Sequence, residues 1–286
     1  MTKPVRSMRK IMKTIFLFGL ILVACVAGCH AQEKLDRDVA RWTAVQPPPR
    51  SDWQKYYDFL NLANHSEHEW IVRQENGKVV ASLKDDNKPS ASDAPAFDTT
   101  VQLQASKGPA NMFLKVDDGW IAAYNRGEFG AAVYWFNSDG KKRQKLSDHQ
   151  INQFMVDNGR IFAVEGLAHM VSRGSMIELR KEKGQWTVEE FFPLSGSAEA
   201  IAQVSSGDYV IVTSDMLLRV NLEKEINILI PNGDWGSLYP NSAAIADDGY
   251  IYIGMRQFVV KCKLSISVQS FTFLVPDKAW LNTKKE

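Results

Sequence analysis

The amino-acid sequence predicts an all-β protein, a β-propeller of about five or six four-stranded blades, preceded by a short helical segment. Three observations predict this fold. One hairpin pattern occurs five times, with turn glycines at Gly77, Gly119, Gly159, Gly207 and Gly249. Successive glycines stand 42, 40, 48 and 42 residues apart. Further strand-like sequence follows the hairpins, and four short strands per repeat of this length are typical of a propeller blade.

The turn residues justify each hairpin. Asp118-Gly119, Asn158-Gly159 and Asp248-Gly249 suit tight hairpins, in which both central residues adopt positive φ. The first repeat is irregular, and we expect a strand from the N-terminal segment or the C-terminal tail to complete its blade and close the ring. A large β-sandwich is the competing fold, but it would not explain the near-constant period.

The N-terminus predicts export. A basic start precedes the apolar stretch 15–28, which is too short to span a bilayer comfortably. Val26-Ala27-Gly28-Cys29 resembles the lipobox of bacterial lipoproteins, which implies a signal peptide over 1–28 and lipidation of Cys29. Cleavage before Cys25 and ordinary cleavage after Ala31 are the alternatives. Because His30 stands where that family's inner-membrane signal is Asp, the resemblance implies an outer-membrane anchor facing the periplasm.

We expect residues 29–66 to form a lipid-anchored tether and residues 67–286 to form the propeller. The tether contains the stiff Pro47–Pro49 spacer and a short amphipathic helix opened by a capping pattern at Ser51 and Gln54. One helical face carries aromatic and apolar side chains, namely Trp53, Tyr56, Tyr57 and Leu60. We expect that face to pack against its own domain rather than against a partner.

The net charge argues against nucleic-acid binding, and the cysteine content argues against thiol chemistry. Removal of residues 1–28 deletes five cations and no acid, so the formal charge falls from +1 to −4. No basic stripe remains that could neutralise phosphates, so nucleic acid is not an expected partner. After lipidation of Cys29, Cys262 would be the one cysteine left in the mature chain, and its alternation with apolar neighbours predicts a buried, unreactive thiol.

A candidate metal site follows from the repeat. The positions eight residues before the repeat glycines should ring the mouth of the central channel. Four of the five carry oxygen ligands, namely Glu69, Asn111, Glu199 and Asn241, while the fifth is Ile151 with Asn152 beside it. Two carboxylates with amide carbonyls suit a hard cation such as Ca²⁺. Asn and Glu also cap strand starts in propellers without a metal, which is the structural alternative.

Residues 239–254, YPNSAAIADDGYIYIG, resemble the Pro-Asn-Gly strand opening of gluconolactonase-like propellers, whose architecture strictosidine-synthase-like proteins share. In that family a Glu and several Asn or Asp side chains hold the catalytic metal, which the resemblance carries to Asn241 and Glu69. Ser242 departs from the family's Gly. If such a metal is present, we expect it to polarise a carbonyl or activate water, with His149 or His169 as the candidate base.

Long loops at the same channel mouth suggest a different function. They cover 125–130, 147–150, 166–174 and 232–240, and the side chains that suit partner binding in them are Arg126, Phe129, Arg173, Trp235 and Tyr239. Trp235 and Tyr239 could instead be buried between blades. Walker, dinucleotide-binding and nucleophile-elbow motifs are absent from the sequence.

The sequence therefore predicts first a non-catalytic envelope lipoprotein that binds a protein or glycan partner through its loop-rich face. The alternative is a Ca²⁺-dependent hydrolase of the lactonase type, and a wholly structural propeller comes third.

Overall fold

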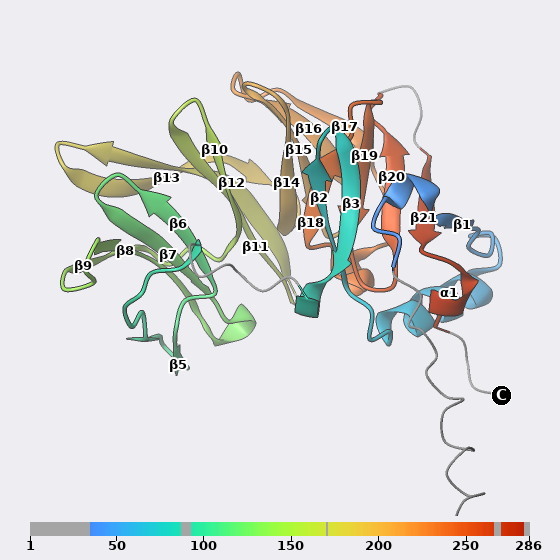
Figure 1. Ribbon diagram of the computed structural model, residues 1–286, viewed down its shortest axis with the longest axis horizontal. Helices are drawn as coiled ribbons and strands as arrows, with labels where there is room; N and C mark the ends of the chain where they lie inside the picture. Colours follow the sequence, from blue (N-terminus) through green and yellow to red (C-terminus); the bar gives the residue numbers. More distant parts are fainter. Residues whose placement is uncertain (1–34, 87–92, 170, 266–269, 283–286) are drawn as a thin grey trace, which may run out of the picture. The chain divides into compact units, whose positions relative to one another are not determined.

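The computed structural model describes residues 35–86, 93–169, 171–265 and 270–282 (Figure 1). Asp36–Glu286 forms one compact unit. The expected signal peptide and Cys29 lie outside the described residues. Among the described residues, no helix is both long and apolar enough to cross a membrane.

All five hairpins are present, which confirms the repeat. Their strand pairs are β2 (Trp70–Glu75) with β3 (Lys78–Leu83), β6 (Met112–Val116) with β7 (Gly119–Asn125), β10 (Ile151–Asp157) with β11 (Arg160–His169), β14 (Ala198–Ser205) with β15 (Asp208–Thr213), and β18 (Ser242–Ile245) with β19 (Tyr250–Gly254). Asn158 and Gly159 have φ of 49° and 77°. The β10–β11 turn therefore uses left-handed backbone at both central positions, as the sequence predicts. In Asp118-Gly119 and Asp248-Gly249 only the glycine has positive φ, so the prediction is wrong for Asp118 and Asp248.

Four of the repeats build four-stranded antiparallel sheets in simple strand order. They add β8 (Ala131–Asn137) and β9 (Arg143–Ser147) to the second hairpin, β12 (Val171–Glu182) and β13 (Gln185–Leu194) to the third, β16 (Leu217–Asn221) and β17 (Ile226–Ile230) to the fourth, and β20 (Val259–Lys263) and β21 (Phe271–Val275) to the fifth. Within the described ranges, which omit residues 87–92, the first hairpin is a two-stranded sheet. The sheets are thus propeller-like, and the four-stranded expectation fails for the first repeat.

Neighbouring sheets contact one another through their first strands, in the order β10, β14, β18 and β2, and the β6–β9 sheet joins through β7 and β10. Figure 1 shows the first hairpin beside β18. Within the described residues the sheets do not close into a ring. The number of blades expected from the sequence is therefore not confirmed.

The N-terminal segment is divided between two sheets. Strand β1 (Thr43–Val45) pairs with β21 and becomes the fifth strand of the last sheet. The segment also contacts the first hairpin, through the Asp38–Val80 bridge, the Ala81 amide that donates to the Arg37 carbonyl over 2.8 Å, and the Arg37–Glu75 ion pair at 2.8 Å. Among the described residues the segment thus lies against the first hairpin without adding the expected completing strand, while its strand β1 extends the last sheet.

The part of the expected tether from Asp36 onward belongs to the same compact unit as the sheets. Helix α1 (Trp53–Asn64) begins at N-cap Asp52 rather than at Ser51, and the Asp52 side chain accepts from the Lys55 amide. Tyr56 and Leu60 of the helix are buried in one hydrophobic cluster with residues of the last two sheets. Burial of these side chains removes apolar area from water, which favours a docked helix over a free tether.

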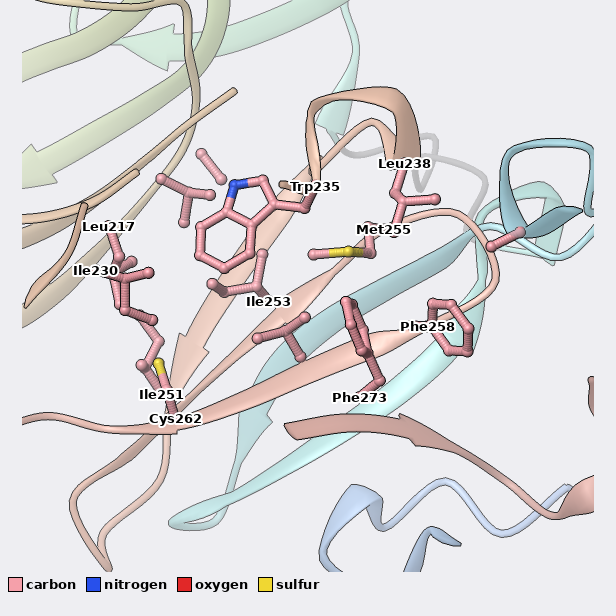
Figure 2. Packing of buried hydrophobic residues seen from close by; sticks show 14 of the residues in the cluster. Leu217, Ile230, Trp235, Leu238, Ile251, Ile253, Met255, Phe258, Cys262 and Phe273 are labelled. Atoms are coloured by element: carbon pink, nitrogen blue, oxygen red, sulfur yellow. The ribbon is translucent and has the colours of Figure 1, made fainter. Parts of the chain in front are cut away.

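Figure 2 shows this cluster, in which Trp235 lies near Ile253 and Met255. Cys262 is buried in the same cluster and forms no disulfide. Burial raises the pKa of its thiol to about 12. The expectation of a core-facing cysteine is confirmed.

The shorter elements complete the chain. They are the 3-10 turns η1 (Val39–Arg41), η2 (Lys84–Asp86), η4 (Gly127–Phe129), η5 (Gly236–Leu238) and η6 (Lys278–Trp280), and the two-residue strands β4 (Val101–Gln102) and β5 (Lys107–Gly108). Trp42, which follows η1, packs edge-to-face on Trp70 with ring centroids 4.8 Å apart.

Candidate partner-binding face

We define the loop face as the end of the sheets at which β2, β6, β10, β14 and β18 begin. The β11–β12 turn, η4, η5 and the contact of η5 with α1 lie at this end. The four candidate metal ligands and most candidate partner-binding residues belong to it, as the repeat predicts. The sequence thus places these residues on one face, and the structure decides which of them meet.

Glu69 and Asn241 meet directly. Asn241 Nδ2 donates to Glu69 Oε1 over 2.9 Å, and Lys84 Nζ lies 2.6 Å from the same oxygen. The side-chain oxygen of the same residue, Asn241 Oδ1, accepts a hydrogen bond from Ser242 Oγ. The two best candidate ligands therefore complete an ion pair and a hydrogen-bond network that joins the first and last repeats.

The side-chain amides of Asn111 and Asn152, also on the loop face, form hydrogen bonds within and between the sheets. Asn111 Oδ1 accepts from the Asn125 amide over 2.9 Å, and Asn125 Nδ2 donates to Asn152 Oδ1 over 2.6 Å. Asn152 Nδ2 donates to the Ala198 carbonyl over 2.8 Å. These bonds satisfy backbone and side-chain groups between sheets, which is the strand-capping role that the sequence left open.

Glu199 differs from the other three. It is half-buried on β14, and no ion pair of its carboxylate is present among the described residues. Burial raises the pKa of this carboxyl. Glu199 is therefore the one candidate ligand whose carboxylate is not committed to the fold.

These residues do not fit a divalent cation in the arrangement observed. The Lys84 ammonium lies against the Glu69 oxygen that a metal would need, and the amides of Asn152 and Asn241 point their donors at protein oxygens. Within the described ranges, no group of three or more His, Cys, Asp and Glu side chains is placed to hold a metal. We therefore derive no reaction step through a metal.

The two candidate bases lie apart from these ligands. His169 Nε2 is 2.8 Å from Glu128 Oε2, which joins the β11–β12 turn to η4. His149 is half-buried, and its Nδ1 atom is buried without a partner. In the described structure neither imidazole forms a hydrogen bond or ion pair with Glu69, Asn111, Glu199 or Asn241. The lactonase constellation is not assembled.

Three candidate partner-binding residues gather around one part of the loop face. A cleft of about 490 Å³ between η4, β9 and the β11–β12 hairpin is lined by Arg173 and by Gln102, Glu128, Tyr134, Lys145 and Asp148. Phe129 is exposed on η4, and Arg126 Nη2 donates to the Pro109 carbonyl, which holds that side chain in place. This part of the face offers both charge signs and an apolar ring to a partner.

Trp235 and Tyr239 differ in exposure to solvent, although they lie only four residues apart in the sequence. Trp235 is 0% exposed, and its Nε1 donates to the Thr213 carbonyl over 3.0 Å (Figure 2). Its side chain cannot touch a partner, so the buried alternative holds for this residue. Tyr239 is 53% exposed, and the Arg256 guanidinium carbon lies 4.5 Å from its ring centroid. Tyr239 therefore remains available as a contact residue.

Two aromatic residues of this face were expected to pack inward. Trp53 and Tyr57 are 61% and 52% exposed on α1, whereas Tyr56 and Leu60 of the predicted apolar face are buried. The helical period alone could not separate them, because all four fall within one broad stripe. The capping residue Asp52 fixes the start of the helix, and the docking of Tyr56 fixes its rotation.

No family model and no curated protein matches this chain. Several solved structures are similar to it, all distantly. Virginiamycin B lyase from Staphylococcus aureus has 13% identity over 56% of this chain and 53% of its own, with a TM-score of 0.39. A gluconolactonase from Xanthomonas campestris has 10% identity over 56% of this chain and 62% of its own, with a TM-score of 0.37.

A third similar structure is the extracellular domain of a protein assigned to the one-component systems, from B. thetaiotaomicron. It has 9% identity over 72% of this chain and 34% of its own length, with a TM-score of 0.39. The chain thus spans less than two thirds of each of these structures. They are distant β-propeller proteins with enzymatic and non-enzymatic roles. The similarity does not assign an activity to this chain.

Proposed function

We propose that this protein is a bacterial envelope lipoprotein whose propeller-like sheets bind a protein or glycan partner through the loop face, without catalysis. The observation that carries the proposal is the contrast on that face. Glu69, Asn111 and Asn241 are engaged in bonds between repeats, whereas Arg173, Phe129 and Tyr239 are exposed. Exposed aromatic and arginine side chains on a rigid scaffold are the usual material of binding hot spots.

The N-terminal sequence supports the envelope location in this proposal. Val26–Cys29 resembles a lipobox, and a lipoprotein carries more than one acyl chain, which is enough for stable anchoring. A lipid at Cys29 would hold the sheets at the outer membrane, facing the periplasm.

Partner capture tests the loop face. We expect the tagged full-length protein, solubilised in detergent, to retain its partner from envelope extracts of its own bacterium after cross-linking. Arg173→Ala and Tyr239→Ala should each weaken recovery about tenfold, because each removes a large exposed contact side chain. Quantitative mass spectrometry of the retained material measures the effect.

The matched control is Ile228→Ala, because Ile228 is similarly exposed but lies on the outer strand β17. Its recovery should equal that of the wild type. If Arg173→Ala, Tyr239→Ala and Phe129→Ala all retain the same material in wild-type amounts, the loop face is not the binding surface.

The second candidate is the Ca²⁺-dependent hydrolase of the lactonase type, and the uncommitted carboxyl of Glu199 favours it. Under our first proposal, we expect the melting temperature to be the same in EDTA and in millimolar Ca²⁺. Ligand at about 100 times its Kd would stabilise the protein by about 2.7 kcal/mol, which is several degrees for a chain of this size. Such a rise, abolished in the Glu69→Gln/Glu199→Gln variant, would instead support the hydrolase. Lactone hydrolysis would then be assayed in His149→Ala and His169→Ala.

A further inference from the structure

Helix α1 presents an aromatic platform on the loop face. Trp53 and Tyr57 stand one helical turn apart, both exposed, with ring centroids 6.3 Å from each other. Exposed aromatic side chains that gather in one patch, rather than singly, mark a contact surface. Neither residue was among those that the sequence singled out for binding.

The platform is held rigidly by the rest of the helix. Tyr56 and Leu60 are buried in the core cluster. Arg50 Nη2 lies 2.9 Å from Asp234 Oδ2, and its guanidinium carbon is 5.7 Å from the Tyr56 ring centroid. At the other end of the helix, Arg256 Nη1 donates to the Asn64 carbonyl over 2.8 Å. A ligand that stacks on Trp53 would therefore order little protein on binding.

Trp53 forms one wall of a cleft of about 470 Å³ that also involves the β11–β12 hairpin, the β13–β14 and β15–β16 connections and η5. The other lining residues are Leu60, Ala168, Ser172, Ser195, Ser214, Asp215, Asp234 and Gly236. Apart from the indole, the walls are thus mostly hydroxyls, carboxylates and small side chains. No lysine or arginine is among the described residues that line the cleft.

The polar groups of the cleft are partly ordered by one another. Ser172 Oγ lies 3.2 Å from Ser214 Oγ, and Asp215 Oδ1 accepts from Thr213 Oγ1 over 3.1 Å. Each hydroxyl and carboxylate retains further capacity to donate or accept. The cleft therefore combines a flat apolar wall with several fixed hydrogen-bonding groups, which is the composition of an orienting small-molecule site.

We infer that this cleft binds a neutral saccharide, with a pyranose ring stacked on Trp53 and its hydroxyls bonded to the serines and Asp215. A pyranose has one apolar C–H face and a rim of hydroxyls, which matches an indole opposite Ser and Asp side chains. Phosphate or sulfate would be disfavoured by the Asp215 carboxylate, since no lysine or arginine is among the described lining residues. An apolar peptide would leave the hydroxyls unpaired at a cost of about 1–3 kcal/mol each. The inference rests on the proposed function, for which it selects a glycan as partner.

Binding of defined oligosaccharides to the full-length protein in detergent tests the inference. The probes are neutral hexamers with gluco-, manno-, galacto- and N-acetylglucosamino-type backbones, titrated by calorimetry and by tryptophan fluorescence. We expect at least one of them to bind the wild type, and Trp53→Ala to weaken that binding at least tenfold. Asp215→Ala should weaken it about fivefold, and Ile228→Ala should leave it unchanged.

Absence of binding by every probe would overturn the inference, and so would binding that Trp53→Ala and Asp215→Ala leave intact. Partner capture separates this failure from failure of the proposed function. If material is retained through Arg173 and Tyr239 but Trp53→Ala has no effect on it and no saccharide binds, the loop face is a protein-binding surface. In that outcome the proposed function stands and the saccharide cleft is wrong.

Discussion

Replacement of Trp235 by Ala should lower the free energy of unfolding by about 3–5 kcal/mol, as for other large aromatic residues in cores. The side chain is fully buried among Leu238, Ile253 and Met255 (Figure 2). Truncation would leave a large cavity and orphan the Thr213 carbonyl, which accepts from the indole. The melting temperature should fall by roughly 10 °C for a chain of this size.

Two further variants show that the effect is one of packing. Trp235→Phe keeps one aromatic ring but loses the N–H donor and the volume of the second ring, so it should cost less than Trp235→Ala. Tyr239→Ala, four residues away and exposed, should change the melting temperature by about 1 °C at most, since surface substitutions lie within about 0.5 kcal/mol. Equal melting temperatures for Trp235→Ala and Tyr239→Ala would contradict the buried position of Trp235.

Neutralisation of Glu178 should give the second large effect. Its carboxylate is 3% exposed, and it accepts from Arg160 Nε and Nη2 over 2.9 and 3.0 Å and from Arg180 Nη2 over 2.6 Å. Burial opposes its ionisation, but the two guanidinium groups outweigh burial and hold the pKa at about 2, against an ordinary value of 4.5. We therefore expect Glu178→Gln to destabilise the protein by about 2–3 kcal/mol at pH 7.

The pH dependence of that difference follows from the direction of the shift. A carboxyl whose pKa is lower in the folded state contributes stability that is fully present above pH 4.5 and is lost as the pH falls towards 2. The wild type and Glu178→Gln should therefore differ most above pH 5 and converge near pH 2. Urea unfolding at several pH values measures this, and a difference independent of pH would show that packing, not charge, is at work.

The repeat could be predicted because its information is local. Hairpin turns depend on the φ preference of Gly and Asn, and strands depend on the alternation of apolar and polar residues. Asn158-Gly159 and the four corresponding hairpins can therefore each be predicted from a short segment of sequence. The position of Cys262 in the core was legible for the same reason. How the repeats associate is not local. From the sequence, we expect a strand of the N-terminal segment or of the C-terminal tail to complete the first blade. Strand β1 of the N-terminal segment instead pairs with β21 of the last sheet, a choice that depends on contacts between residues far apart in the chain.

The candidate site divides in the same way. The sequence placed Glu69 and Asn241 at corresponding strand starts, and the structure brings them within hydrogen-bond distance. It could not show that Lys84, fifteen residues beyond Glu69, would take the carboxylate oxygen. A polar side chain has many partners of equal chemistry, and only the packed backbone selects one of them.

The amino-acid sequence was enough to predict the repeating unit: five hairpins with their turns, the alternating core positions and the face on which the loops gather. The tertiary structure decided which side chains of that face are available. Trp235 and Tyr239 are neighbours in sequence, yet one fills the core and the other meets solvent. Trp53 and Tyr57 share a helical stripe with two buried residues, yet remain exposed. Exposure depends on what packs against a residue from distant parts of the chain, which local periodicity does not contain.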